Sequence, residues 1–399
     1  MRLIFSIQRI AIGMAFSVGM AGAAQAQDEV LIGASLPLSG PLAGFGAYQK
    51  WGYETAVSEV NKAGGISIDG KKVPVRLIIR DDKTDSNVTA SNTETLLSRD
   101  KVTAMLGSCT PALVNAGALV AERHKVPLVS GGDPLGAFKS VRKWQYAWVL
   151  FFDETELAKA PFHMISDLGL QTNKKIALMA NNDPDGQAIG GQAWPTAAKA
   201  NGFQVVKSTS FPVDTQQFTS MIDQAKSNGA DIAMVVAIPP QAISIRKQMA
   251  SSGFTPKLLV MEKGAEPEFF AQAAGKLSDG VLVSGYWDPT FPYPGAADLA
   301  KRFESETKQT QSQHIADSYA AAHVLLDAIA TAGSTDREKI NAAIAKTDKT
   351  YVVGPVKFDA GHTSAIPITV MQWQSGKAVV VWPEDRANGK LIFPLPDAK

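Results

Sequence analysis

The chain has 399 residues, of which 45% are hydrophobic and 19% charged, and its formal net charge is +1. This composition is that of a folded protein of roughly two domains, and it excludes intrinsic disorder, collagen and coiled coil. The near-neutral charge, with no long basic run, argues against a nucleic-acid-binding protein held by phosphate contacts. The single cysteine, Cys109, can form neither an intramolecular disulfide nor a metal site with several cysteines.

Residues 1–26 have the pattern of a secretory signal peptide. Arg2 and Arg9 precede an uncharged stretch of apolar and small residues, and Ala24-Gln25-Ala26 fits the A-x-A cleavage rule. The apolar stretch is short for a membrane-spanning helix, which needs about 20 residues. We therefore expect cleavage after Ala26 and export of the mature protein to the periplasm.

From residue 30 onward, short strand-like runs alternate with longer helical ones. We expect strands at residues 30–36, 73–80, 102–107, 126–130, 175–180, 204–208, 232–237, 257–261 and 280–284. We expect helices at residues 48–62, 87–100, 112–124, 156–168, 187–201, 216–228 and 242–252. Near-continuous apolar strands such as residues 233–237 are typical of parallel sheets covered on both faces. The alternation therefore predicts an α/β protein with doubly wound sheets.

The pattern changes after Tyr286. Two long helices are expected at residues 296–308 and 316–332, a shorter one near 337–346, and two final strands at 367–373 and 378–382. The two βα blocks divide near residues 149–153, which predicts two lobes with a cleft between them. Ligands of open α/β sheets bind beyond the carboxyl ends of the strands, so the loops that follow the strands are the candidate site.

The loop at residues 107–112 is suited to bind a carboxylate. Thr110 is a natural helix N-cap and Pro111 suits the first helical position, which predicts that a helix begins here. The N–H groups of Ala112 and Leu113 would then lack helical partners, with the positive end of the helix dipole behind them. A helix cap without any ligand is the plainer interpretation of the same residues.

Three further loops follow expected strands. Residues 36–46 are rich in glycine and proline but lack the spacing of a phosphate-binding loop. The glycines of residues 130–134 would let the backbone approach a ligand closely. Residues 261–265 place Lys263 directly after an apolar strand, where it is either part of a solvated rim or the partner of a ligand anion.

No catalytic constellation is recognisable in the sequence. The five histidines lack metal-ligand spacing, and no GxSxG motif is present. Cys109 and His124 would lie about four turns apart on a helix, beyond hydrogen-bond reach. We read Asp81 and Asp82 as a solvated strand end. We therefore expect a protein that is not an enzyme and has no cofactor and no metal site.

Several short segments, each weak alone, occur in a characteristic order. They are LSGPLA at 38–43, EVNKAGGI at 59–66, RDDK at 80–83, VPL at 126–128, GVLV at 280–283 and GPVKFDAG at 354–361. In this order and spacing, the mature chain resembles the type I periplasmic solute-binding proteins of ABC transporters, in the leucine/isoleucine/valine-binding branch.

The resemblance implies two doubly wound α/β lobes joined by a three-strand hinge. Lobe 1 would comprise residues 27–149 and 287–354, and lobe 2 would comprise residues 150–286 and 355–399. The lobes would close on a small carboxylate-bearing solute, which a membrane permease of an ABC transporter then takes up. No cofactor is implied, and we expect a monomer.

The resemblance also implies the ligand contacts. The matching positions are Phe45, Thr110, Pro111, Ala112, Gly132, Pro134, Asp185, Ile238 and Lys263. Members that bind α-amino acids carry an acid at the position of Lys263, where a lysine would repel the ammonium. Pro111 stands where a serine often helps to bind the carboxylate, and Asp185 stands where an aromatic ring is common.

These departures favour a carboxylate without an adjacent ammonium, such as an aromatic or other organic acid. Lys263 would hold the anion, and Phe45, Phe151 and Phe152 would supply the apolar wall. Asp185 would either pair with Lys263 or bind a hydroxyl or a remote ammonium of the ligand.

Two alternative functions stay open. The protein would be a plain branched-chain amino acid binder if Lys263 faced away from the cleft. A periplasmic sensor that reports ligand occupancy to a protein partner would share the same fold. A signal peptide without a fused signalling domain favours transport over sensing.

Overall fold

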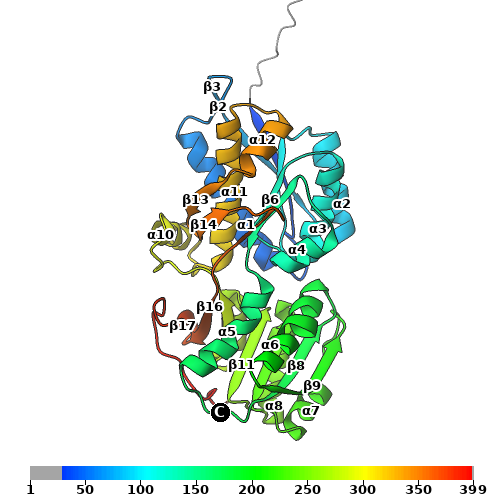
Figure 1. Ribbon diagram of the computed structural model, residues 1–399, viewed down its shortest axis with the longest axis vertical. Coiled ribbons are helices and arrows are strands. Elements are labelled where there is room, and N and C mark those ends of the chain that lie inside the picture. The colour runs from blue at the N-terminus through cyan, green and yellow to red at the C-terminus, as the bar shows by residue number, and fades with distance from the viewer. Residues whose placement is uncertain (1–28, 398–399) are drawn as a thin grey trace, which may run out of the picture.

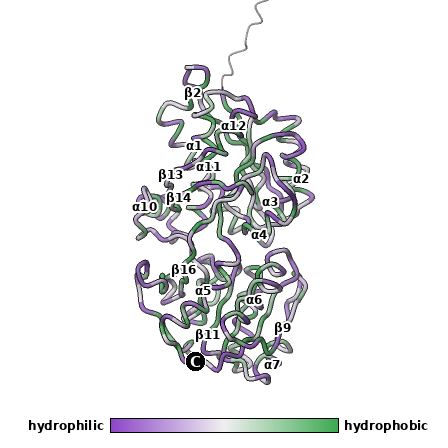
Figure 2. Tube along the Cα trace, in the orientation of Figure 1, coloured by the Kyte–Doolittle hydropathy of each residue, from purple (hydrophilic) through white to green (hydrophobic). Residues whose placement is uncertain are grey.

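The computed structural model describes residues 29–397, so the predicted signal peptide lies outside the described residues. The chain forms two α/β lobes, which lie one above the other in Figure 1. Within residues 29–397, no helix combines the length and the apolar character that crossing a bilayer requires. Figure 2 shows that hydrophobic stretches run through the interior of each lobe, whereas hydrophilic ones lie mostly in outer loops and on outer helix faces.

The first lobe is built on a six-stranded sheet in the order β15-β7-β6-β5-β1-β4, in which all neighbours are parallel. Its strands are β1 (Val30–Leu36), β4 (Val75–Asp81), β5 (Ala104–Leu106), β6 (Leu128–Ser130), β7 (Ala147–Phe151) and β15 (Thr363–Ala365). Two small hairpins flank it, β2 (Ile66–Ile68) with β3 (Lys71–Val73), and β13 (Asp348–Tyr351) with β14 (Gly354–Lys357).

Helices cover both faces of this sheet, as a doubly wound fold requires. Helix α1 packs against α11, and α2 packs against α3 on the other side (Figure 1). The helices of the lobe are α1 (Ala43–Lys62), α2 (Ser86–Ser98), α3 (Thr110–Arg123), α4 (Leu135–Val141), α10 (Ala296–Thr307), α11 (Gln313–Ala332) and α12 (Arg337–Ile344).

The second lobe has a seven-stranded sheet in the order β17-β16-β12-β11-β10-β8-β9. Strands β8 to β12 run parallel, and β16 and β17 are antiparallel additions. The strands are β8 (Lys175–Asn181), β9 (Gln204–Phe211), β10 (Ile232–Ala237), β11 (Leu258–Lys263), β12 (Leu282–Gly285), β16 (Thr369–Gln374) and β17 (Lys377–Trp382). The helical elements are α5 (Glu154–Asp167), η1 (Gly186–Ala193), α6 (Trp194–Ala200), α7 (Thr219–Ser227), α8 (Pro239–Ser252), α9 (Glu268–Ala274) and η2 (Gly275–Ser278).

Local chemistry accounts for several of these boundaries. Asp85 caps α2, because its carboxylate accepts hydrogen bonds from the N–H groups of Asn87 and Val88. Helix α8 ends at Gly253, whose φ of 65° is the left-handed conformation that glycine adopts without strain. All six residues of β10 are buried, as expected for a central parallel strand with helices on both faces. The predicted α/β fold with two doubly wound lobes is confirmed.

The chain crosses between the lobes three times, after β7, after β12 and after β15. The boundary expected at residue 355 is therefore corrected, because β14 and β15 precede the third crossing and β15 pairs with β7 of the first sheet. Likewise, β7 continues to Phe151, beyond the expected boundary at residue 149. The short strand Thr363–Ala365 has no apolar run that would have revealed it in the sequence.

Candidate functional site

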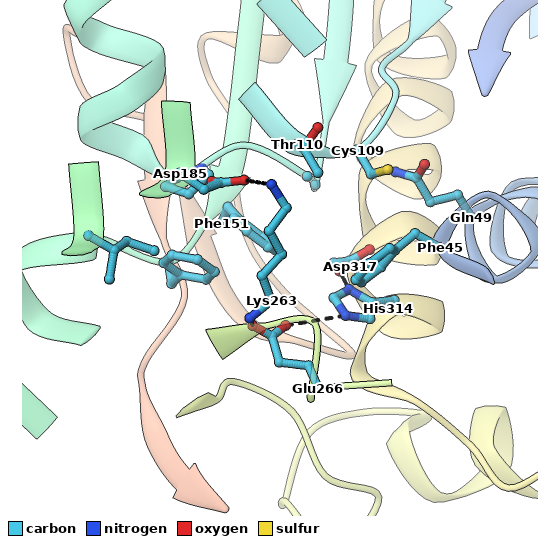
Figure 3. A pocket seen from close by; sticks show the side chains of 15 residues that line it. Phe45, Gln49, Cys109, Thr110, Phe151, Asp185, Lys263, Glu266, His314 and Asp317 are labelled. Carbon is cyan, nitrogen blue, oxygen red and sulfur yellow. Dashed lines mark hydrogen bonds and ion pairs between the residues drawn. The ribbon is translucent and has the colours of Figure 1, made fainter. Parts of the chain in front are cut away.

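A small cavity of about 50 Å³ lies between the two lobes, beyond the carboxyl ends of the parallel strands (Figure 3). The first lobe contributes α1, the loops after β5 and β6, and α11. The second lobe contributes the loops after β8 and β11. The lining residues are Phe45, Gln49, Cys109, Thr110, Gly131, Gly132, Pro134, Phe151, Phe152, Asp185, Ile189, Lys263, Glu266, His314 and Asp317.

Most of the residues expected at the site line this cavity. They are Phe45, Thr110, Gly132, Pro134, Phe152, Asp185 and Lys263. Pro111 and Ala112 instead line the neighbouring interlobe cleft, and Ile238 packs against the small cluster that contains Phe45 and Cys109. Contact of any of these residues with a solute stays a prediction.

Helix α3 begins at Thr110, the residue that the sequence predicted to be its N-cap. The N-cap is Cys109, and Thr110 is the first helical residue with a φ of 62°. A positive φ is strained for a β-branched residue, and such strain is concentrated at functional sites. The N–H groups of Thr110 and Ala112 belong to the first turn and have no partner within the helix, whereas Pro111 has no N–H to offer.

The Lys263 ammonium is paired within the protein, one of the alternatives that the sequence left open. Its Nζ lies 2.6 Å from Asp183 Oδ2 and 2.6 Å from Asp185 Oδ2, so its charge is already paired twice. Burial alone would lower the pKa of Lys263, but the two carboxylates raise it above its ordinary value and keep the ammonium charged. Asp185 thus pairs with Lys263, one of the two roles expected for it. Contact of Lys263 with a ligand anion stays a prediction.

The two aspartates differ in their electrostatics. Burial would raise the pKa of Asp183, but Lys263 and hydrogen bonds from Gly186 N and Asn181 Nδ2 lower it. Burial dominates at Asp185 and raises its pKa to about 6, although Lys263 opposes this shift. Asp185 is therefore the member of the group that takes up a proton first as the pH falls.

A second polar group, which the sequence analysis missed, begins beside Lys263 and extends to the first lobe. Glu266 Oε1 accepts the backbone N–H of Lys263 at 2.6 Å, and its Oε2 lies 3.4 Å from His314 Nε2. His314 Nδ1 lies 3.3 Å from Asp317 Oδ2, which also accepts the Tyr286 hydroxyl at 2.8 Å. Glu266 belongs to the second lobe, and His314 and Asp317 belong to the first, so this group joins the lobes.

Burial and neighbouring charges set the protonation of this group. Burial would lower the pKa of His314, but Asp317 and Glu266 raise it to about 9. Burial raises the pKa of Asp317 to about 6, although His314 opposes the shift. His314 is therefore cationic at neutral pH. The signal available in the sequence was the i, i+3 spacing of His314 and Asp317 on one helix face, but the helix was expected to begin only at residue 316.

Aromatic rings form the apolar part of the lining. The Phe45 ring meets His314 edge to face at 4.7 Å between centroids. Phe151 lies 4.3 Å from Phe152 and 5.1 Å from Tyr286, next to the first and second crossings between the lobes. The cavity therefore combines aromatic walls, carboxylates from both lobes and two cations that are already paired.

A family model described as "Periplasmic binding protein" matches residues 29–378. The chain is 27% identical over 406 residues to "Leu/Ile/Val-binding protein homolog 8" of Brucella suis biovar 1, covering 97% of this chain and 99% of that one. It is 25% identical to "Leu/Ile/Val-binding protein homolog 7" of the same strain over 404 residues, covering 96% and 98%.

Solved structures show the same fold. The leucine-binding protein LivK of Thermotoga maritima superposes with a TM-score of 0.79 at 23% identity, covering 89% of this chain and 99% of that one. A solute-binding protein of an ABC transporter from R. palustris, solved in complex with benzoate, gives 0.76 at 18% identity, covering 88% and 95%. The chain belongs to the periplasmic binding protein family and is a binding protein rather than an enzyme.

Proposed function

We propose that this protein captures a small carboxylate-bearing solute between its two lobes and delivers it to the membrane permease of an ABC transporter. The observation that carries the proposal is the interlobe cavity lined by loops of both sheets (Figure 3). The three crossings between the lobes provide the hinge, and closure of the lobes would remove the solute from water.

The start of α3 is the proposed site of the carboxylate. The hydroxyl and the backbone N–H of Thr110 are donors at the positive end of a helix dipole. The paired ammonium of Lys263 leaves this helix start as the stronger attraction for an anion. Isoleucine and benzoate, which are bound in two structures of the same fold, both carry a carboxylate.

The opposite side of the cavity favours a donor group on the solute. Glu266 presents a carboxylate there, near the base of Lys263, and an acceptor of this kind binds an ammonium or a hydroxyl (Figure 3). The resemblance places an acid at the position of Lys263 in members that bind α-amino acids. In this chain, Glu266 supplies an acid three residues later. An α-amino acid with an apolar side chain is the first candidate, which revises the expectation of a solute without an ammonium.

An aromatic acid is the second candidate, because three phenylalanine rings line the cavity. Phe45, Phe151 and Phe152 present flat apolar surfaces suited to a benzene ring. A hydroxyl on that ring would take the place proposed for the ammonium beside Glu266.

Isothermal titration calorimetry with matched solutes tests these assignments. Leucine, 4-methylpentanoate and leucinamide share one side chain and differ only in the ammonium or the carboxylate, and benzoate and 4-hydroxybenzoate form the aromatic pair. We expect leucine to bind about tenfold or more tightly than 4-methylpentanoate, and leucinamide not to bind. Binding of leucinamide with affinity equal to leucine would contradict the carboxylate site, and preference for the benzoates would select the second candidate.

Delivery to a permease is tested in cells. A strain that lacks this gene should accumulate the radiolabelled solute more slowly, and the gene in trans should restore uptake. Unchanged uptake in the deletion strain, with binding in vitro intact, would favour a sensor instead.

A further inference from the structure

We propose that the triad of Asp183, Lys263 and Asp185 is a fixed wall that limits the length of the solute. The proposal rests on the proposed function, since it concerns the size of the solute in the same cavity. Lys263 would act through the bulk of its aliphatic chain and not as an anion-binding group.

Both ends of the Lys263 side chain are held. At the base, the backbone N–H donates to Glu266 Oε1 at 2.6 Å, and a φ of 66° turns the residue out of β11 toward the cavity. The turn is tight, because a Cβ on Gly264 would lie only 2.5 Å from the carbonyl oxygen of Ala237. At the tip, two aspartates bind the ammonium, each at 2.6 Å. A side chain that is normally flexible is therefore restricted to one path.

The aspartates are themselves positioned. Asp183 accepts the N–H of Gly186 at 2.9 Å and the Asn181 amide at 3.0 Å, which anchors it to the end of β8 and the start of η1. The side chains of Lys263 and Asp185 are only 9% and 7% exposed. All members of the triad belong to the second lobe, so the wall does not depend on closure of the lobes.

The position of the triad makes it a boundary of the cavity. In Figure 3 the Lys263 side chain extends from the end of β11 to Asp185, facing Phe45 and His314. Two of the three ammonium hydrogens have carboxylate partners, and the aliphatic chain presents apolar surface. A shorter side chain at position 263 would enlarge the cavity by the volume of the atoms removed. Ile189 also lines the cavity.

The test compares two triple variants. Lys263→Ala alone would leave two buried carboxylates unpaired, which strongly destabilises a fold. We therefore use Lys263→Ala/Asp183→Asn/Asp185→Asn. The matched control, Lys263→Met/Asp183→Asn/Asp185→Asn, makes the same change in charge but retains a chain of similar bulk.

Calorimetric titrations with two homologous series report the length limit. The series are straight-chain 2-amino acids with a lengthening side chain, and benzoate, phenylacetate, 3-phenylpropanoate and 4-phenylbutanoate. We expect the alanine variant to bind the longer members about tenfold more tightly than the methionine variant does, for each added methylene that now fits. The methionine variant should keep the wild-type limit. An equal limit in all three proteins, or the same shift in both variants, would overturn the proposal.

Crystal structures of the two variants provide a measurement that needs no solute. We expect a larger cavity in the alanine variant only, with the loop after β8 in place. If that loop collapsed into the space and left the cavity unchanged, the proposal that the triad is a fixed wall would be wrong. If the wild type binds no carboxylate while the cavity enlarges as expected, the proposed function fails and the structural role of the triad stands.

Discussion

His314 and Glu266 lie on different lobes, yet His314 Nε2 is 3.4 Å from Glu266 Oε2 at the edge of the interlobe cavity. Gln313, the residue before His314, also donates its side-chain amide to Glu266 Oε2 at 3.4 Å. Glu266 is therefore a point at which the second lobe contacts the first, as well as a lining residue of the cavity.

Replacement of Glu266 should weaken solute binding. Glu266→Gln keeps the shape of the side chain but removes the charge that pairs with His314 and, under the proposed function, with an ammonium of the solute. We expect the affinity for the best amino acid of the calorimetric panel to fall about tenfold, which corresponds to about 1.4 kcal/mol. Glu268→Gln, the same change at a neighbouring position outside the cavity lining, is the control. Equal affinities for wild type and Glu266→Gln would exclude this role.

The raised pKa of His314 predicts a pH-dependent stability. The imidazole faces Glu266, Asp317 and the Tyr286 hydroxyl, and its pKa rises from 6.5 to about 9 in the folded protein. Because the folded-state pKa is the higher one, this contribution to stability is fully present below pH 6.5 and is lost as the pH rises through about 9. Urea unfolding between pH 6 and 9.5 should show this loss in the wild type and a flatter profile in His314→Gln. Parallel profiles for the two proteins would contradict the assignment.

Asp133 predicts a second pH dependence. It is completely buried, and neither carboxyl oxygen has a hydrogen-bond partner among the described residues. Burial, with the Asp185 and Glu154 carboxylates, raises its pKa well above the usual range. Asn115 lies beside it with a buried, unpartnered Oδ1, which a protonated Asp133 could satisfy as donor.

Because the pKa of Asp133 is higher in the folded than in the unfolded protein, its contribution to stability is fully present below about pH 4 and is lost as the pH rises. Asp133→Asn, which carries no charge, should therefore gain about 1–3 kcal/mol over the wild type between pH 5 and pH 8. Chemical unfolding at the two pH values measures the difference. Asp298→Asn, at a side chain that is 88% exposed, should show no such gain.

We expect a substitution at Thr110 to raise the stability of the fold while it weakens solute binding. Its φ of 62° is strained for threonine but not for glycine. Thr110→Gly should stabilise the fold by about 1 kcal/mol, because relief of this strain outweighs the added flexibility of the unfolded chain. It should also weaken solute binding, because the hydroxyl at the start of α3 is lost. Thr110→Ala removes the hydroxyl without relieving the strain, so it should lose affinity but not gain stability; a stability gain equal to that of glycine would falsify the strain argument.

Gly44 predicts a steric requirement for closure. It lies on α1 of the first lobe, and a Cβ there would clash with the Phe269 ring of the second lobe. Gly44→Val should hold the lobes apart and lower solute affinity about tenfold without touching the cavity lining. The double variant Gly44→Val/Phe269→Ala should recover the affinity, because the ring that causes the clash is gone. Small-angle scattering with saturating solute should show a larger radius of gyration for the single variant only.

Much of the fold could be predicted because its signals are local. The strands at residues 30–36 and 232–237 were expected with the boundaries that the structure shows, since central parallel strands are continuous apolar runs. The sequence did not predict that the short strands β7 and β15 belong to one sheet, because their pairing joins residues more than two hundred positions apart.

The site was predictable only as a set of loops. Parallel strands bring their carboxyl ends to one edge, so the loops holding Thr110, Gly132, Asp185 and Lys263 had to be neighbours. Their chemistry depended on contacts that no local pattern contains. The sequence shows that Lys263 is a cation, but it does not show its partners. Asp183 and Asp185 follow another strand, β8, and form ion pairs with Lys263 only in the folded protein.

The sequence by itself therefore determined the fold, the family and the loops that border the cavity, because apolar periodicity, turn residues and short motifs act over a few positions. Only the tertiary structure decided which charges are available to a solute. Burial and distance between side chains set the pairing of Lys263 and the protonation of His314, and both depend on where the two lobes place their loops.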